Sequence, residues 1–257
     1  DAATPEAAPS PPADGMAAEP EPEGDTMPPL ERFAAEFANP ESKPVLAVVL
    51  IDTGAEGIDR ASLAALPFPV TFALDPLDPA APDHAAIYRA AGQEVAMLAT
   101  GFPRGAQAGD VEVALAGMER ALPEAVAMMD LPDRRVQGDR PLASLVVPAV
   151  GDAGLGLLSW DEGLNAAEQV ATRERVPSAT IFRNLDAADE GAPAITRYLD
   201  RAVFKSAQEG AVIVAGHTRP ETVEALLEWS VGARAALVAL APASAVIMRG
   251  KTREGGG

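Results

Sequence analysis

Polar residues follow most of the short apolar runs in this 257-residue sequence, at the points where buried strands would end. They are Asp52, Asp75, Thr100, Asp130, Ser159 with Asp161, Arg183 with Asn184, and His217. If the runs are parallel strands, their carboxyl ends meet at one face and these side chains converge there. Such a set is typical of a binding or catalytic pocket. Each Asp taken alone also suits helix capping, because its carboxylate accepts hydrogen bonds from free backbone N–H groups.

His217 has the widest chemical range of these residues. It stands between Gly216, at a strand end, and a helix that we expect to begin near Arg219. An imidazole in that position can act as a general acid or base. It can equally make a structural hydrogen bond to a loop carbonyl, and the sequence leaves both interpretations open.

The supply of metal ligands is small. A hydrolytic zinc site usually takes three protein ligands, commonly with two histidines among them. The chain has two histidines and no cysteine, and we expect the second histidine, His84, in a surface turn. A histidine-rich metal site is therefore excluded, and a carboxylate-only site for Mg²⁺ or Ca²⁺ has no spaced motif behind it. The sequence also lacks the glycine-rich phosphate-binding motifs and the GxSxG nucleophile motif.

The elements that must position these residues alternate between strand and helix. We expect strands at 45–51, 70–74, 95–98, 125–129, 155–158, 179–182, 211–215 and 235–240. Three amphipathic faces indicate helices, and they are Val111, Leu115, Met118, Leu122; Ile195, Leu199, Ala202, Val203; and Val223, Leu226, Leu227, Val231. The last helix begins with a capping-box pattern at 218–221, with a proline in its first turn. This order predicts an α/β fold with about seven parallel strands, and periodicity alone leaves a closed barrel and an open sheet as alternatives.

The first 43 residues differ in composition from the rest of the chain. They contain nine prolines and ten acidic residues but only two basic residues. We therefore expect a disordered acidic, proline-rich linker at 1–43, an α/β domain at 44–248 and a flexible tail at 249–257. Leu30, Phe33, Ala34 and Phe37 repeat at helical spacing, which favours a short helix packed back on the domain over a partner-binding motif.

Charge and hydropathy limit the partners. A formal net charge of −18 makes nucleic acid and anionic membrane surfaces poor partners. No apolar stretch is long enough to span a bilayer, so we expect a membrane connection only through a removed N-terminal segment, if at all. The start at Asp1 fits a removed signal peptide or anchor, and equally a chosen expression start.

Four segments, in this order along the chain, resemble motifs of the divergent polysaccharide deacetylases, relatives of the NodB-type carbohydrate esterases. They are the first strand with Asp52 and Gly54 (48–54), the second strand with its preceding proline (66–74), the lead into the third strand (90–95), and the Gly-His-x-x-Pro-x-Thr segment (216–222). The resemblance covers about residues 44–247. It implies a distorted (β/α) barrel, a periplasmic or otherwise exported location, and an ancestral removal of N-acyl groups from amino sugars by metal-activated water.

The departures from the family pattern fall on metal ligands. Thr53 stands where the family has a second, ligating Asp. Leu98 and Leu131 stand where histidines are found, and Ser159 replaces an Asp. Only Asp52, the base in active relatives, and His217 are retained. Because an aliphatic side chain offers no lone pair, we expect that a divalent metal such as zinc has been lost, which leaves no cofactor.

We therefore expect a catalytically inactive envelope protein that binds a glycan or a protein partner in the cleft at the strand ends. Its ligand-binding residues would be Asp75, Asp130, Trp160, Asp161, Asn184 and Arg219. Trp160 is either a sugar-stacking surface or, more in keeping with its type, core filler. The alternative is a residual carbohydrate deacetylase with Asp52 and His217 as an acid–base pair. A third hypothesis makes the tail at 1–43 the interacting part.

Overall fold

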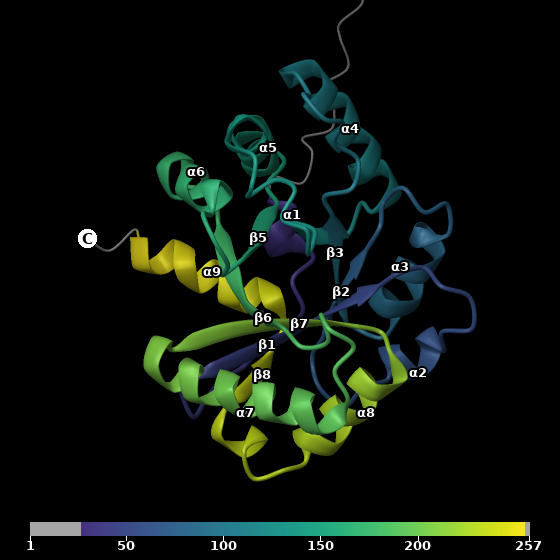
Figure 1. The fold of residues 1–257 in the computed structure, drawn as a ribbon, viewed down its shortest axis with the longest axis vertical. Coiled ribbons are helices and arrows are strands. Elements are labelled where there is room, and N and C mark those ends of the chain that lie inside the picture. The colour runs from purple at the N-terminus through teal and green to yellow at the C-terminus, as the bar shows by residue number, and fades with distance from the viewer. Residues whose placement is uncertain (1–26, 255–257) are drawn as a thin grey trace, which may run out of the picture.

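Seven parallel strands close into a barrel with helices around it, in a computed structural model that describes residues 27–254 and their side chains as far as residue 250 (Figure 1). The strands are β1 (Val45–Asp52), β2 (Thr71–Leu74), β3 (Glu94–Leu98), β4 (Ala125–Met129), β5 (Gly156–Trp160), β6 (Ser178–Asn184) and β7 (Ala211–His217). They follow one another around the barrel, and β1 closes the ring by pairing with both β7 and β2. The expected strand–helix alternation is confirmed, and the sheet is a closed barrel.

Two apolar layers explain why the strands read as continuous apolar runs. In β1, Leu46, Val48 and Leu50 belong to the cluster that faces the helices. Val45, Val49 and Ile51 belong to a second cluster that draws residues from every strand, which places it inside the barrel. A strand that is buried on both faces carries apolar side chains on both, so its sequence does not alternate between apolar and polar residues.

The outer layer consists of seven helices: α2 (Arg60–Ala64), α3 (Ala81–Ala90), α4 (Ala108–Ala121), α5 (Arg140–Asp152), α6 (Ala166–Glu174), α7 (Ala192–Glu209) and α8 (Pro220–Ser230). The faces expected for α4 and α7 are buried. The face expected for α8 is wrong in part: Leu226 is buried and Val223 packs against the core, but Leu227 is 39% exposed and Val231, past the helix end, is 86% exposed. Trp229 sets the buried face instead, with its indole N–H donating to Asp200 of α7 at 3.1 Å.

The capping box expected at the start of α8 does not form. No side chain caps this helix, although Pro220 does occupy its first turn. The backbone N–H of Thr218 donates to the carbonyl of Ile51 at 3.1 Å, and the Thr218 hydroxyl also points to that oxygen, at 3.5 Å. Thr218 therefore continues the contact between β7 and β1, which removes it from the cap position.

The last expected strand, 235–240, is also wrong in part. Its first half is a 3-10 helix, η1 (Ala235–Leu237), and only β8 (Ala239–Ala241) is extended. Alanine has low strand propensity, so an alanine-rich stretch needs strong pairing to stay extended. β8 pairs only with the start of β1, on the edge that β2 uses further along.

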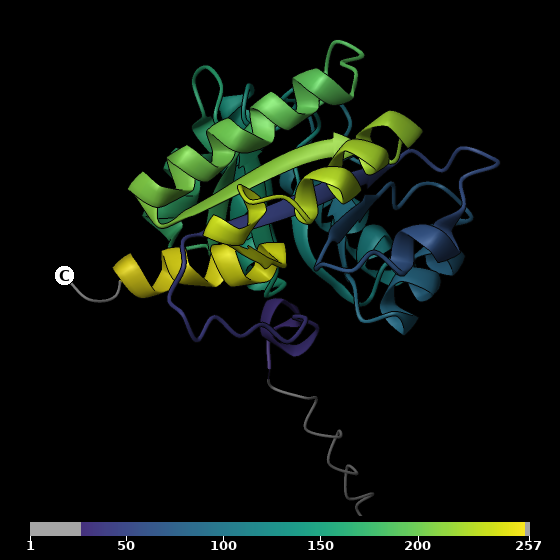
Figure 2. The ribbon, with the colours of Figure 1, turned by 90° about the horizontal axis from the view of Figure 1, so that it is seen from below.

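The amino end of the barrel is closed by two terminal segments, α1 (Pro29–Arg32) and α9 (Ala243–Glu254) (Figure 2). Leu30 and Ile247 are both buried and both reach Gly156, at the start of β5. The short helix expected over 30–37 is thus found, but it ends at Arg32, and Phe33 and Phe37 pack half-buried beyond it. Residues 1–26 of the expected linker lie outside the described residues.

A buried carboxylate ties this floor together. Glu94 accepts hydrogen bonds from the N–H of Ala35 at 3.0 Å, the hydroxyl of Thr71 at 2.9 Å, and the N–H and hydroxyl of Ser244. Residues 27–43 are therefore in part attached to the barrel, and α9 continues past residue 248. Between residues 27 and 254, no helix is long and apolar enough to cross a membrane.

Candidate functional site

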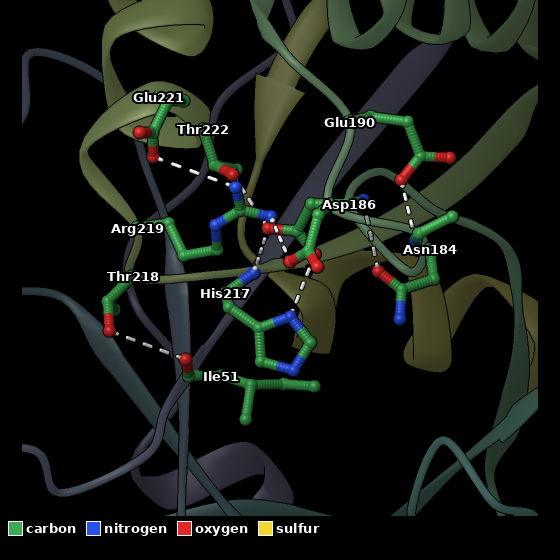
Figure 3. Close-up of polar contacts among 11 residues, drawn as sticks. Ile51, Asn184, Asp186, Glu190, His217, Thr218, Arg219, Glu221 and Thr222 are labelled. Carbon is green, nitrogen blue, oxygen red and sulfur yellow. Dashed lines mark hydrogen bonds and ion pairs between the residues drawn. The ribbon is translucent and has the colours of Figure 1, made fainter.

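His217 and Asp186 form a hydrogen-bonded pair at the carboxyl end of β7 (Figure 3). The imidazole Nδ1 lies 2.7 Å from Oδ1 of Asp186. Oδ2 of Asp186 accepts from the backbone N–H of His217 at 2.8 Å and from the hydroxyl of Thr222 at 2.6 Å. A β-carbon on Gly216 would lie 3.0 Å from Cγ2 of Thr222, which is tighter than ordinary van der Waals contact. Glycine at this position of β7 therefore lets Thr222 approach the strand and bond to Asp186.

The charge on Asp186 fixes the role of the imidazole. Burial acts to raise the pKa of Asp186, but hydrogen bonds from His217 and Thr222 outweigh it and hold that pKa below its usual range. An ionised carboxylate only accepts, so Nδ1 of His217 carries a proton, and Nε2 is an acceptor whenever the ring is neutral. Nε2 has no hydrogen-bond partner among the described residues, and the side chain is 27% exposed. The pair therefore presents one nitrogen to a ligand.

Asp52 has a different environment. Its carboxylate is fully buried and accepts from four donors: Arg60 Nε at 2.7 Å and Tyr88 Oη at 2.8 Å on Oδ2, and Arg60 Nη2 and the Gly54 N–H, both at 3.0 Å, on Oδ1. Burial acts to raise the pKa of Asp52, but the bonds from Arg60, Tyr88 and Gly54 outweigh it and leave that pKa lowered. Asp52 thus faces α2 and α3, like the outward residues of β1.

The structure does not bring Asp52 and His217 into contact. Asp52 is paired with Arg60 and Tyr88, and His217 is paired with Asp186. Tyr88 is itself buried and stacks on Phe72, with ring centroids 3.7 Å apart. Its pKa is raised by burial and by the adjacent carboxylate, so its hydroxyl remains a donor. The acid–base pair of the alternative hypothesis is therefore not assembled.

Three residues of these networks were missed from the sequence: Asp186, Arg60 and Tyr88. Asp186 follows the end of β6 by two residues, so a wider window behind each strand would have included it. Arg60 begins a short helix after β1, and Tyr88 lies inside α3. Neither position carries a local signal, because only the packing of α2 and α3 on β1 brings them to Asp52.

Two predicted acids hold loops. Asp75 accepts from the N–H of Leu77 at 2.9 Å and from the hydroxyl of Thr100 at 2.6 Å. Asp130 is buried and accepts from the backbone N–H groups of Leu131, Val136 and Gln137 at 2.9, 3.0 and 2.7 Å. Burial outweighs these bonds and raises the pKa of Asp130. Neither residue caps a helix, because Ala80 and Asp139 hold the N-cap positions of α3 and α5, so both carboxylates fix loop backbone instead.

Trp160 packs inside the barrel. It is 3% exposed, and its indole N–H donates to the carbonyl of Asp130 at 3.1 Å. Trp160 therefore has no open ring face for a sugar, which corrects the stacking interpretation and favours core filler.

The other three predicted ligand residues lie near the mouth with partners of their own. Asp161 is 3.4 Å from Lys205 in an ion pair. Asn184 accepts from the N–H of Asp186 at 3.3 Å, and Arg219 is paired with Asp189 at 3.2 Å. The two ion pairs are exposed on at least one side, so a ligand can compete for them at small cost, whereas the bond of Asn184 is partly buried.

The positions of the expected metal ligands do not fit a metal. Thr53 is exposed. Leu98 lies in the apolar interior of the barrel, and Leu131 is half-buried and packs against that interior. Ser159 is buried and accepts from Asn165 at 2.8 Å. Within the described part of the chain, no three His, Cys, Asp or Glu side chains are arranged to hold a metal ion. His84 does not lie in a surface turn as expected, because it is half-buried in α3.

The sequence profile of the divergent polysaccharide deacetylases matches residues 48–247. This chain belongs to that family. The predicted family resemblance is thereby confirmed. No curated protein matches the chain in sequence.

Solved structures agree on the fold. An uncharacterized protein from Agrobacterium tumefaciens superposes with a TM-score of 0.74 at 19% identity, over 87% of this chain and 96% of that one. A deacetylase with substrate superposes with a TM-score of 0.56 at 13% identity, over 83% of this chain and 95% of that one. A family 4 carbohydrate esterase from Streptomyces lividans, in complex with acetate, superposes with a TM-score of 0.53 at 13% identity, over 77% of this chain and 91% of that one. At such low identities these likenesses establish the deacetylase-type barrel and nothing finer.

Proposed function

We propose that this chain is a family member without hydrolytic activity, and that it binds a glycan of the cell envelope at the barrel mouth around His217. The observation that carries the first half is the environment of Asp52. Both of its oxygens are occupied by donors, and two of the four donors come from the Arg60 guanidinium.

A carboxylate held in this way is a poor general base. A base must reach the proton that it removes, and it works best with a pKa near the working pH. The Asp52 carboxylate is buried behind α2 and α3, and its pKa is lowered further from neutrality. Water activation without a base then rests on a metal, for which Thr53, Leu98 and Leu131 supply no charged ligand.

Ligand binding is supported by what the mouth retains. Asp186 fixes the His217 ring so that Nε2 accepts a hydrogen bond from outside, and Arg219 and Asn184 add polar groups nearby. Sugar hydroxyls suit such groups, because each can donate and accept. We place the protein in the periplasm or another exported location, in line with its family, and a protein partner is the other outcome of the test.

Metal analysis and acetate release test the loss of activity. We expect less than stoichiometric zinc, manganese or other divalent metal after purification, and no acetate from N-acetylated chito-oligosaccharides. One metal ion per chain together with acetate release above the blank would overturn this half of the proposal.

Binding is tested separately, by following the backbone N–H signal of His217 in NMR titrations with soluble peptidoglycan fragments and chito-oligosaccharides. We expect a saturable shift. In His217→Ala, where the N–H of the alanine at this position is followed, the affinity should be at least tenfold lower. Arg120→Gln is the matched control, because Arg120 lies on the surface of α4 and bonds only within its own helix. Binding that His217→Ala leaves unchanged, or the absence of any shift, would contradict glycan binding at this mouth and direct the search to protein partners.

A residual hydrolase remains the second candidate, and the Asp186–His217 pair favours it. This geometry is that of a histidine oriented by a carboxylate for proton transfer. If the activity exists, Asp186→Asn lowers it at least tenfold, whereas Asp52→Asn, at a carboxylate outside the mouth, leaves it largely intact.

A further inference from the structure

Arg183 is directed out of the barrel by a bulge in β6. Ala179 and Ile181 face the barrel interior, so regular alternation would turn Arg183 inward as well. The register between β6 and β7 shifts between Ile181 and Arg183. As a result Phe182 and Arg183 both face α7: the ring of Phe182 lies 4.9 Å from Lys205 Nζ, and the Arg183 guanidinium lies 3.8 Å from the ring centroid of Tyr198. Bulges of this kind re-aim side chains, often beside functional sites.

The Arg183 guanidinium has no acceptor. Its Nε is buried without a hydrogen-bond partner, and no ion pair or hydrogen bond joins Arg183 to any other described residue. Stacking on Tyr198 covers one face of the guanidinium but satisfies none of its in-plane N–H donors. Leaving a buried charged donor unsatisfied is costly, so such a group calls for an acceptor from outside the chain.

Further cations lie on the same edge of α7. Arg201 is three residues after Tyr198 and four before Lys205, so all three share one side of the helix, and Arg197 is one turn earlier. Arg197 and Arg201 are exposed and have no carboxylate partner among the described residues. In a chain with 38 acidic and 20 basic residues, such a group of guanidiniums is not accounted for by internal pairing.

The acids near this edge are already engaged. Glu190 accepts from the Tyr198 hydroxyl at 3.3 Å and from the N–H of Ala188 at 2.7 Å. Asp161 and Glu209 lie 3.4 and 2.8 Å from Lys205. None of these three carboxylates forms an ion pair with Arg183, which therefore keeps its charge for a ligand.

A cavity lies along the preceding part of β6 and reaches as far as Phe182, the chain neighbour of Arg183. It has a volume of about 480 Å³ and is lined by residues that include Thr180, Phe182, Lys205 and Arg249. It lies where β6 and β7 separate, since their pairing begins only at Ile181 and Ile213. Its lining does not include Arg183, Tyr198 or Arg201, so the cavity and the arginine group are separate features.

We propose that Arg183, with Arg201 beside it, binds an oxyanion on the outer side of β6, at a site distinct from the barrel mouth. A carboxylate or phosphate matches the paired donors of a guanidinium edge. The same chemistry is offered by the carboxylate of an acidic sugar and by inorganic phosphate. Nothing in this site depends on His217 or on the proposed loss of hydrolysis.

NMR of the arginine Nε–Hε groups in the full chain tests the site. The Arg183 signal is assigned by its loss in Arg183→Lys. The protein is titrated with sodium glucuronate, with sodium phosphate, and with sodium chloride at matched ionic strength. We expect a saturable shift of the Arg183 signal with glucuronate, phosphate or both, and no saturation with chloride. The salt that saturates it identifies the source of the oxyanion.

Variants separate the site from general charge effects. Arg201→Gln is expected to weaken binding several-fold with the Arg183 signal still visible, and Arg120→Gln is expected to change nothing. In Arg183→Lys, which keeps the charge but loses the paired donors, calorimetry should show at least tenfold weaker binding. Equal shifts in chloride, no saturation with either oxyanion, or unchanged affinity in Arg183→Lys would overturn the proposal.

Discussion

Removal of the Arg60 guanidinium should destabilise the protein strongly at neutral pH. The change is Arg60→Met, which keeps a long apolar side chain but takes two of the four donors from Asp52. The Asp52 side chain is 0% exposed and that of Arg60 is 10% exposed, so water cannot replace the lost donors without rearrangement. Breaking a buried ion pair by removing one partner costs about 3–5 kcal/mol. Because Tyr88 and Gly54 still donate to Asp52, we expect about 3 kcal/mol.

The pH dependence identifies the cause. In the native protein the pKa of Asp52 is lowered, so its contribution to stability is present above the unfolded pKa, about 3.9, and is lost as pH falls through the folded pKa. In Arg60→Met, burial acts against fewer donors and the pKa of Asp52 rises. The free-energy difference between variant and native protein should therefore be larger at pH 7 than at pH 4.

Urea unfolding at both pH values, followed by circular dichroism, gives these free energies. Arg120→Met serves as the surface control and should stay within about 0.5 kcal/mol of the native protein. Tyr88→Phe removes one hydrogen bond to the same carboxylate and should cost about 1.5–3 kcal/mol. A cost below about 1 kcal/mol for Arg60→Met, equal at both pH values, would refute the view that Arg60 holds a buried, ionised Asp52.

Three further perturbations test the floor and the mouth of the barrel. Leu30→Ala should cost about 2–5 kcal/mol in urea unfolding, because a buried side chain leaves a cavity at the barrel floor; a cost no greater than that of Met27→Ala, at an exposed position, would contradict the packing of α1. Gly216→Ala puts a β-carbon 3.0 Å from Cγ2 of Thr222, a partner of Asp186, and should cost about 1–3 kcal/mol and shift the backbone N–H signal of His217. Gly109→Ala, in open space on α4, should instead leave stability equal or slightly higher. Asp186→Asn should flatten the stability profile below about pH 5, because the lowered pKa of Asp186 gives stability that is present above the unfolded pKa and lost as pH falls; an unchanged acid limb would show that this carboxylate is not ionised in the fold.

The parallel strands of the barrel could be predicted because their apolar runs are stable only when both faces are buried. The run Val45–Ile51 is apolar without interruption, and only burial on both faces suits such a sequence. The last run, at 235–240, failed because its alanines fill space without favouring extension, so a 3-10 turn formed there. The prediction that Val231 is buried failed for a related reason. Helical spacing shows which residues share a face, but the large side chain of Trp229 determines which face packs against the barrel.

The ends of two strands were predicted, but not the partners of the residues there. The strand-end rule placed Asp52 and His217 at the ends of β1 and β7, where the structure has them, but not the outward direction of Asp52. It did not locate Arg60, Tyr88 or Asp186, which come from a short helix, a helix interior and a loop. Partners of this kind are set by how helices pack on the sheet, and a bulge such as the one before Arg183 leaves no mark in the sequence.

The floor of the barrel joins parts of the chain that are synthesised far apart in time. Ser244 bonds to Glu94 across 150 residues, and the N–H of Ala243 bonds to Thr71 across 172 residues. On the ribosome β1 cannot pair with β7 until residue 217 has emerged, and the floor cannot close until α9 has followed. Contacts of such long range slow folding and leave apolar strand surface uncovered in the meantime. We therefore expect that nascent chains ending before α9 depend on chaperones, and that emergence of α9 ends the period in which the barrel is prone to aggregate.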